Sequence, residues 1–271
     1  MGRLRMSERE ENKKDQRDAL DGGFAVVDRE RLIDEETRKV APWYKHFIHV
    51  FISPVKMMEE CFNQDPPKGT SVGVVGVIVF TVICLGLTFI NPQYKQILLN
   101  QLRSQGIGEV ALDQSYQLGI ITGLIGGLIG VFIGCLIGAI VLFIIKIIAR
   151  DKGRFGTIYK VMLLASMVGL AVQSLDALFA LVIGQYGTIF GISILLSQEQ
   201  LQQPVFSVVA SVVSLQSIAQ ILIMIIGYKV MTQMSYQKAV LRIGIYELLT
   251  VGSQIGLATL LTSFTQGLIT G

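Results

Sequence analysis

Hydrophobic and polar positions divide the chain into a polar beginning and five long apolar runs. The runs cover residues 72–90, 118–145, 161–184, 205–228 and 243–268. Each is long enough to cross a hydrocarbon core of about 30 Å, because an α-helix rises about 1.5 Å per residue. The pattern therefore predicts an all-α, polytopic membrane helix bundle with five transmembrane helices. The second run is longer than a bilayer requires, so its helix must tilt or project from the membrane.

A different pattern precedes the first apolar run, at residues 42–62. Aromatic side chains are interleaved there with Lys and His, and Pro54 interrupts the segment. Aromatic and basic residues together are typical of the headgroup zone of a membrane. We predict an interfacial amphipathic helix bent at Pro54 and followed by a turn. This region, 42–70, would connect a charged tail at 1–41 to the transmembrane domain at 71–271.

Charged residues are concentrated in that tail. Residues 1–40 hold ten of the 23 Lys and Arg and eleven of the 20 Asp and Glu. The rest of the chain is too apolar and too poorly charged for a soluble core. The net charge of +3 is too small to indicate a nucleic-acid partner. For the tail itself, a short exposed helix and a disordered chain both stay open.

The loops between the apolar runs differ in charge. Residues 146–160 hold five basic residues and one acidic residue, and residues 229–242 hold three basic residues and no acidic one. Residues 91–117 hold two of each sign, and residues 185–204 hold a single Glu. Because cytosolic loops carry an excess of Lys and Arg, the first two loops are expected in the cytosol. This places the N-terminus in the cytosol and, after five crossings, the C-terminus outside.

The second apolar run carries its glycines on one side. At 100° per residue, seven of them fall within about 120° of the helix surface. They are Gly119, Gly123, Gly126, Gly127, Gly130, Gly134 and Gly138. A strip without side chains lets another helix approach closely, and helices in lipid associate through such packing. We expect this glycine zipper to receive another helix of the same chain, because a five-helix bundle needs a central close-packed helix; a partner's helix is the alternative.

The sequence contains no pattern typical of catalysis or of cofactor binding. A phosphate-binding loop, a His-Glu-x-x-His motif and a Cys/His cluster with zinc spacing are all missing. His46 and His49 are three residues apart, but no nearby Cys or carboxylate completes a metal site. We therefore expect a protein that is not an enzyme and that uses no metal or cofactor.

Polar residues inside the predicted spans are the remaining candidates for chemistry. They are Asp176, Glu247, Gln173, Gln216, Gln220 and Gln254. Ionisable groups at membrane depth are costly and often functional, so Asp176 and Glu247 could line a path for a proton or a small solute. The interpretation that we favour is that Glu247 reaches the cytosolic interface near Arg242 and that Asp176 is hydrogen-bonded within the bundle. The glutamines could join neighbouring helices through hydrogen bonds.

Three cytosolic elements carry a resemblance. FISPVKMMEECF at 51–62 precedes the first span, DKGRFGTIYKVMLLAS at 151–166 leads into the third, and IGYKVMTQMSYQKAVLRIGIYELL at 226–249 joins the fourth and fifth. In their order and placement these elements resemble the Ypt-interacting-protein (YIP) domain family over roughly residues 45–268. The matching residues are Ser53, Pro54, Gly153, Phe155, Gly227, Ser235, Lys238 and Ala239. Many relatives have a proline in the third span, and this chain has none from Val161 to Gly184.

The resemblance implies a non-catalytic integral membrane protein that acts as a partner or assembly factor of a membrane complex. Eukaryotic relatives are similar to trafficking factors that contact small GTPases, and bacterial relatives accompany ABC-type exporters of peptides or toxins. The compact loops favour the bacterial cytoplasmic membrane. We expect membrane lipid and ABC transporter components as partners, with a docking surface around Lys152, Arg154 and Lys238, and homo-oligomerisation stays open. A transport subunit using Asp176 and Glu247 is the alternative function, and a membrane-shaping or trafficking factor is a third.

Overall fold

The computed structural model describes residues 43–63, 69–196 and 203–270, which are helical almost throughout. The chain divides into two compact units, and the boundary between them lies between Pro42 and Trp43. The first unit lies outside the described residues, and so do both expectations for the charged tail. In the second unit, no strand occurs among the described residues, apart from one isolated backbone bridge.

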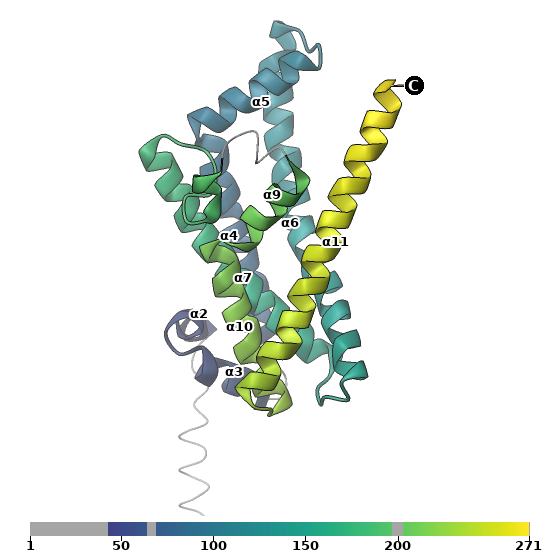
Figure 1. The fold of residues 1–271 in the computed structure, drawn as a ribbon. Helices are drawn as coiled ribbons and strands as arrows, with labels where there is room; N and C mark the ends of the chain where they lie inside the picture. The colour runs from purple at the N-terminus through teal and green to yellow at the C-terminus, as the bar shows by residue number, and fades with distance from the viewer. Residues whose placement is uncertain (1–42, 64–68, 197–202, 271) are drawn as a thin grey trace, which may run out of the picture. The chain divides into compact units, whose positions relative to one another are not determined.

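Within the described part of the chain, five helices are long and apolar enough to cross a membrane (Figure 1). They are α4 (Gly69–Ile90), α6 (Glu109–Ile148), α7 (Phe155–Ile183), α10 (Leu215–Thr232) and α11 (Tyr236–Thr270). This confirms the predicted polytopic helix bundle. The 40 residues of α6 correspond to about 60 Å of helix, so α6 exceeds the thickness of a hydrocarbon core, as the length of its apolar run predicted.

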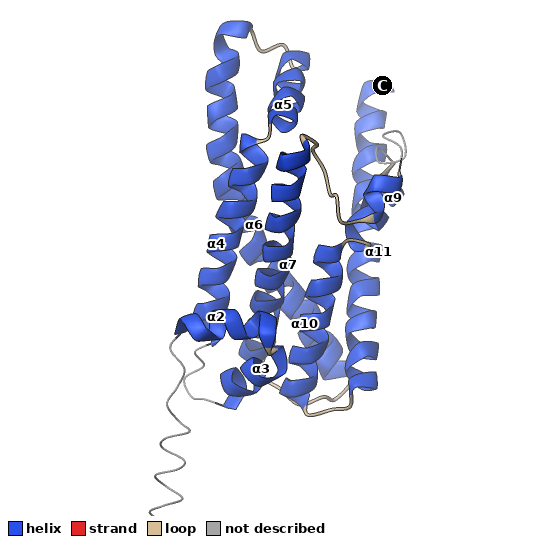
Figure 2. Ribbon diagram, turned by 90° about the vertical axis from the view of Figure 1, so that its left-hand side faces the viewer, coloured by secondary structure: helices blue, strands red, loops and turns tan. Residues whose placement is uncertain are grey.

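Two short helices precede α4 and lie across one end of the bundle (Figures 1 and 2). They are α2 (Trp43–Ile52) and α3 (Pro54–Asn63). The bend expected at Pro54 is a complete break, because proline lacks the N–H that would continue α2 and is well suited to begin a helix. The ring of Phe47 in α2 stacks on Phe80 of α4 with 5.5 Å between centroids, which anchors α2 to the bundle.

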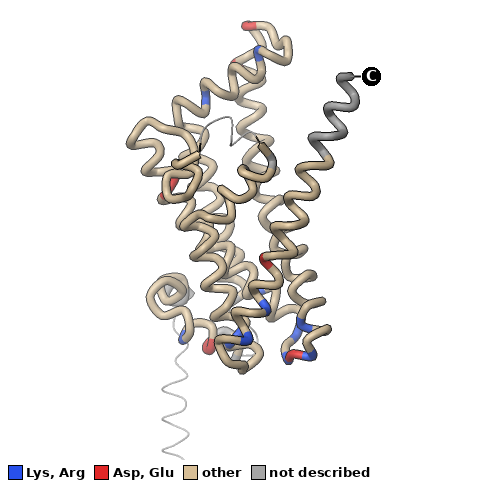
Figure 3. Tube along the Cα trace, viewed as in Figure 1, with Lys and Arg blue, Asp and Glu red and all other residues tan. Residues whose placement is uncertain are grey.

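Lys and Arg residues gather at this same end of the bundle (Figure 3). It holds α2, α3, the turn between α6 and α7, and the turn between α10 and α11; we call it the basic end. The opposite end holds α5 (Pro92–Ser104), which follows α4. A 3₁₀ turn, η1 (Ile192–Leu195), lies in the long connection after α7.

The central helix of the bundle is α7. It packs against α4, α6 and α10, and 44% of its apolar segment is buried, compared with 28% for α6. The expectation that the glycine-rich helix α6 is central is therefore wrong. The physical reason is that α7 carries residues that are buried on several sides, whereas α6 presents a row of exposed isoleucines, including Ile125, Ile129 and Ile133.

Close approach to α7 depends on glycines in its neighbours. A Cβ added at Gly73 of α4 would lie 3.0 Å from the Cβ of Leu163, and one added at Gly227 of α10 would lie 2.7 Å from Cγ1 of Val161. Small residues at such interfaces let helix backbones approach one another. The close-packing role that we predicted for the glycines of α6 thus belongs to glycines of α4 and α10.

The glycines of α6 do not form one groove filled by one helix. Three of them face bulky side chains of other helices: Gly123, Gly127 and Gly138. At three others, an added Cβ would have no atom of another described helix within 4 Å: Gly126, Gly130 and Gly134. At Gly119 the nearest such atom is Cδ2 of Leu98, at 4.0 Å. The predicted internal zipper is therefore present at isolated points only, where single side chains of α4, α7 and α11 reach α6.

The apolar run 205–228, predicted to be one span, is broken. Helix α9 (Pro204–Val212) ends before Ser214, which caps α10 by accepting the Ser217 N–H on its Oγ at 3.2 Å. The isolated bridge pairs Ser214 with Gly191 in the connection that follows α7. Serine hydroxyls compete for backbone groups and favour helix ends, which a hydropathy pattern does not register.

Candidate functional site

A cavity among the described residues lies between α6, α7, α10 and α11. Its volume is about 890 Å³. It is lined by all four glutamines that the sequence placed inside spans: Gln173, Gln216, Gln220 and Gln254. We call it the glutamine cavity. The structure thus brings together residues from three helices that are far apart in the sequence.

Local structure explains how the glutamines reach one place. Gln216 and Gln220 are one helical turn apart and directly follow the Ser214 cap of α10, so both project from the same side of that helix. Gly169 of α7 faces them, and a Cβ added there would lie 3.2 Å from Oε1 of Gln220. A glycine in α7 therefore makes room for a glutamine of α10.

The glutamine side chains do not join the helices as we expected. Within the described residues, none of the four side-chain amides forms a hydrogen bond with another protein group. Among the described residues, the fully buried side-chain N and O atoms that lack a hydrogen-bond partner belong to His49 and Thr81. The polar atoms of the glutamines are not among them, so these amides are not fully enclosed by protein. Leaving an amide without a hydrogen-bond partner in an apolar medium costs several kcal/mol, roughly 2–7. The amides therefore need partners inside the cavity.

The cavity opens between α6 and α11. Its exposed lining residues come from these two helices and are Gly134, Ile137, Leu249, Ser253 and Gln254. Its inner wall is buried and includes Cys135, Met162 and Tyr246. The hydroxyl of Tyr246 lies close to α6, because a Cβ added at Gly138 would be 2.7 Å from that oxygen.

Glu247 lines a smaller neighbouring space of about 230 Å³ between α10 and α11, which shares Gln216 and Gln220 with the glutamine cavity. It is 11 residues beyond the start of α11, or about 16 Å along the helix. No described residue forms a hydrogen bond or an ion pair with its carboxylate.

Arg242, which we expected near Glu247, has a different partner. Its Nε lies 3.1 Å from Oδ2 of Asp151 in the turn between α6 and α7. The same carboxylate oxygen accepts a hydrogen bond from the hydroxyl of Tyr228 at 3.0 Å. These three residues tie α10, α11 and the α6–α7 turn together at the basic end.

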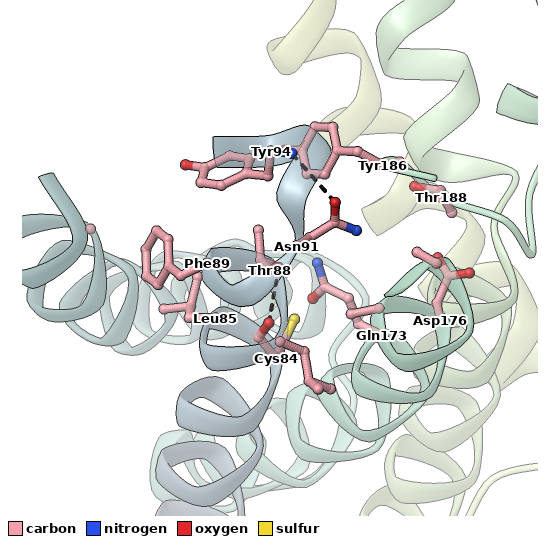
Figure 4. A pocket seen from close by; sticks show the side chains of 15 residues that line it. Cys84, Leu85, Thr88, Phe89, Asn91, Tyr94, Gln173, Asp176, Tyr186 and Thr188 are labelled. Carbon is pink, nitrogen blue, oxygen red and sulfur yellow. Dashed lines mark hydrogen bonds between the residues drawn. The ribbon is translucent and has the colours of Figure 1, made fainter. Parts of the chain in front are cut away.

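Asp176 lies in another cavity, of about 410 Å³, toward the opposite end of the bundle (Figure 4). The residue is 7% exposed, and its Oδ1 accepts hydrogen bonds from the backbone N–H groups of Ile189 at 2.9 Å and Phe190 at 3.0 Å. This is the hydrogen-bonded state that we favoured, and it anchors the connection that follows α7. Gln173 lines this cavity as well as the glutamine cavity, so the two adjoin.

An asparagine and two tyrosines line the Asp176 cavity near the start of α5 (Figure 4). Asn91 caps α5 through Oδ1 and donates from Nδ2 to the Gln185 carbonyl at 2.7 Å, which links α5 to the end of α7. The rings of Tyr94 and Tyr186 have centroids 5.0 Å apart. Burial, with Tyr94 close by, raises the pKa of the Tyr186 hydroxyl, so this tyrosine stays neutral.

At the basic end, Lys152, Arg154 and Lys238 are exposed, as a docking surface requires. Several other residues that carry the family resemblance lie at the starts of helices or in close packing. Pro54 begins α3 and Phe155 begins α7. Gly227 faces Val161 and Met58, and Ala239 is fully buried. These positions have an evident structural role.

Sequence reasoning missed several residues of the glutamine cavity. Ser166, Tyr246 and Thr250 line it, but each lies in an apolar run with no neighbouring motif, so only the arrangement of the helices identifies them. Comparisons of the chain with models of protein families, with curated proteins and with solved structures gave no match.

Proposed function

We propose that this protein is a non-catalytic partner or assembly factor of a membrane complex, of the YIP type, and that it binds its partner at the basic end. One observation carries the proposal. Lys152, Arg154 and Lys238 are exposed there, and none of their side chains has an ion-pair or hydrogen-bond partner among the described residues. Exposed charge without an internal partner supports recognition of an oppositely charged surface.

The basic end also supports an orientation in the membrane. Both basic turns and the two short helices lie at this end, and the excess of Lys and Arg favours the cytosolic side. In this orientation the N-terminus is cytosolic and the C-terminus is outside, in a bacterial cytoplasmic membrane. The partner we propose is therefore a cytosolic or membrane component with an acidic surface, such as the ATPase of an ABC-type exporter.

Purification in mild detergent tests this function. We expect an exporter ATPase to be recovered in stoichiometric amount with the wild-type chain and to be lost with the triple variant Lys152→Glu, Arg154→Glu, Lys238→Glu. The matched control is Lys95→Glu, Arg103→Glu, which reverses charge on α5 at the opposite end. Equal recovery with both variants, or no ATPase with the wild-type chain, would contradict the proposal.

A second candidate function is a transport subunit for a small solute or a proton. The observation that favours it is that polar cavities adjoin from Asp176 to Glu247, since Gln173 borders the first two cavities and Gln216 borders the last two. Flux into liposomes that contain this chain alone tests it. Flux that falls in Asp176→Asn and Glu247→Gln would support transport, and absence of flux in the wild type would exclude it.

A further inference from the structure

We propose that the glutamine cavity binds an uncharged amphiphile from the bilayer, with a head of hydroxyl, ester or amide groups and a single hydrocarbon chain. The head would lie among Gln173, Gln216 and Gln220, and the chain would leave between α6 and α11. This binding site goes beyond the proposed partner function and does not depend on it.

The size of the cavity limits the ligand. Sites for small molecules in proteins typically measure about 300–1,000 Å³ and enclose most of the ligand. The volume of about 890 Å³ lies within this range. This volume suits a small amphiphile and is too small for an additional transmembrane helix.

The lining of the cavity determines the chemistry of the head. Each glutamine amide offers two donors and a carbonyl acceptor, and Ser166, Thr250 and Ser253 add hydroxyls. Among the described residues that line it, none is Asp, Glu, Lys, Arg or His. An anionic head would lose its hydration without gaining a counter-charge, which is strongly unfavourable, and a cationic head would find the nearest carboxylate, that of Glu247, only in the neighbouring space. An uncharged head with several donors and acceptors can instead satisfy the unpaired amides.

The opening of the cavity determines the route. Ile137 of α6 and Leu249 of α11 are exposed at its rim, and both helices are long and apolar enough to span the membrane. Figure 1 shows α11 leaning away from α7 toward its C-terminal end, and only 11% of the apolar segment of α11 is buried. An apolar chain can therefore rest between these helices in contact with lipid, while its head reaches the glutamines.

Gly134 lies at this opening and provides the sharpest test. An added Cβ has no neighbouring atom within 4 Å, so a larger side chain fits without a clash and occupies the entrance. Gly130 is one turn earlier on α6, is equally open, and does not line the cavity. The two positions form a matched pair in which the same substitution has the same helical context.

The experiment is a titration of the purified full-length chain with 1-monolauroylglycerol, followed by native mass spectrometry. We expect saturable binding of one molecule, with affinity at least about tenfold lower in Gly134→Leu and unchanged in Gly130→Leu. A second variant, Gln216→Leu with Gln220→Leu, removes head contacts and should also weaken binding about tenfold or more. Its control is Gln117→Leu, at an exposed position on α6 outside the cavity.

Head-group selectivity in the wild-type chain gives a readout that requires no variant. Laurate and dodecyltrimethylammonium have the same chain length and opposite charges, and we expect both to bind at least tenfold more weakly than 1-monolauroylglycerol. The proposal is overturned by absence of saturable binding, by equal affinity for charged and uncharged heads, or by equal affinity of folded Gly134→Leu and Gly130→Leu.

Discussion

The two halves of the bundle, toward the basic end and toward the opposite end, are packed in different ways. The largest fully buried side chains lie in the basic half and include Tyr228, Met58, Ile158 and Leu164. The glutamine cavity begins beside Met162 and extends away from these residues, and the Asp176 cavity lies further along α7. One half thus supplies the packed core, and the other supplies space lined by polar groups.

The fourth span contributes differently to the two halves. In the basic half, α10 packs against α7 along most of its length, with Gly227 allowing close approach. Toward the opposite end, α10 begins only at Leu215, and α9 packs on α11. Two of the four glutamines, Gln216 and Gln220, lie in the first turns of α10, directly after this start. The cap at Ser214 thus begins the helical turns that place Gln216 and Gln220 in the candidate site.

The largest effect is expected from Gly227→Leu in the packed half. The added Cβ would lie 2.7 Å from Cγ1 of Val161, and a valine in a helix has little freedom to move because one rotamer is strongly preferred. We expect overpacking of this kind to lower the free energy of unfolding by about 3 kcal/mol or slightly less. The measurement is the fraction of protein that elutes as a single species in size-exclusion chromatography after heating in detergent.

The control for this variant is Gly244→Leu on α11. Gly244 is also in the basic half, but an added Cβ there has no neighbour within 4 Å. We expect its thermal stability to equal that of the wild type. If both variants were equally stable, the close contact between α7 and α10 would not determine the stability of this half.

A smaller loss of stability is expected from Arg242→Leu. Together with its control, this variant compares the ion pairs at the two ends of the bundle. The side chains of Arg242 and Asp151 are 25% and 12% exposed, with Nε and Oδ2 3.1 Å apart. Removing the arginine leaves the carboxylate with the Tyr228 hydroxyl as its remaining hydrogen-bond donor among the described residues. We expect a loss of about 1–2 kcal/mol in the free energy of unfolding, since a partly buried charge loses a partner.

The pair at the opposite end provides the control. Arg103 and Glu109 have side chains that are 51% and 85% exposed, with the closest atoms 3.6 Å apart. Exposed pairs contribute about 0–1 kcal/mol, so Arg103→Leu should leave the thermal midpoint close to that of the wild type. A larger loss from Arg103→Leu than from Arg242→Leu would reverse the comparison between the two ends.

Much of the fold could be predicted from the sequence, because the length and composition of an apolar run directly limit what it can form in a membrane. The break at Ser214 could not be predicted from hydropathy. The serines before it are interspersed with valines, so the mean hydropathy of the run is not strongly lowered. The role of the α6 glycines also could not be predicted. Periodicity shows that they share one side of a helix, but it does not identify the neighbour on that side.

The candidate site was predictable only in part. The four glutamines stand out because amides are rare in apolar runs, and their common cavity depends on how α7, α10 and α11 pack. Tyr246 gives no such signal, since aromatic residues are common in membrane helices. Asp176 was recognisable because an ionisable group inside an apolar run is energetically costly. Its partners, the N–H groups of Ile189 and Phe190, were not predictable, because they lie in a connection whose course the sequence pattern does not define.

The smallest effect on stability is expected from Gly130→Leu in the open half. No atom of another described helix lies within 4 Å of an added Cβ, and leucine is a better helix former than glycine. The thermal stability of the monomer should therefore stay within about 0.5 kcal/mol of the wild type. If the monomer is stable but its complexes dissociate, as measured by light scattering coupled to chromatography, the glycine strip serves contacts between chains. Loss of monomer stability would instead mean that α6 is packed as tightly as α10, and the contrast between the two halves would not hold.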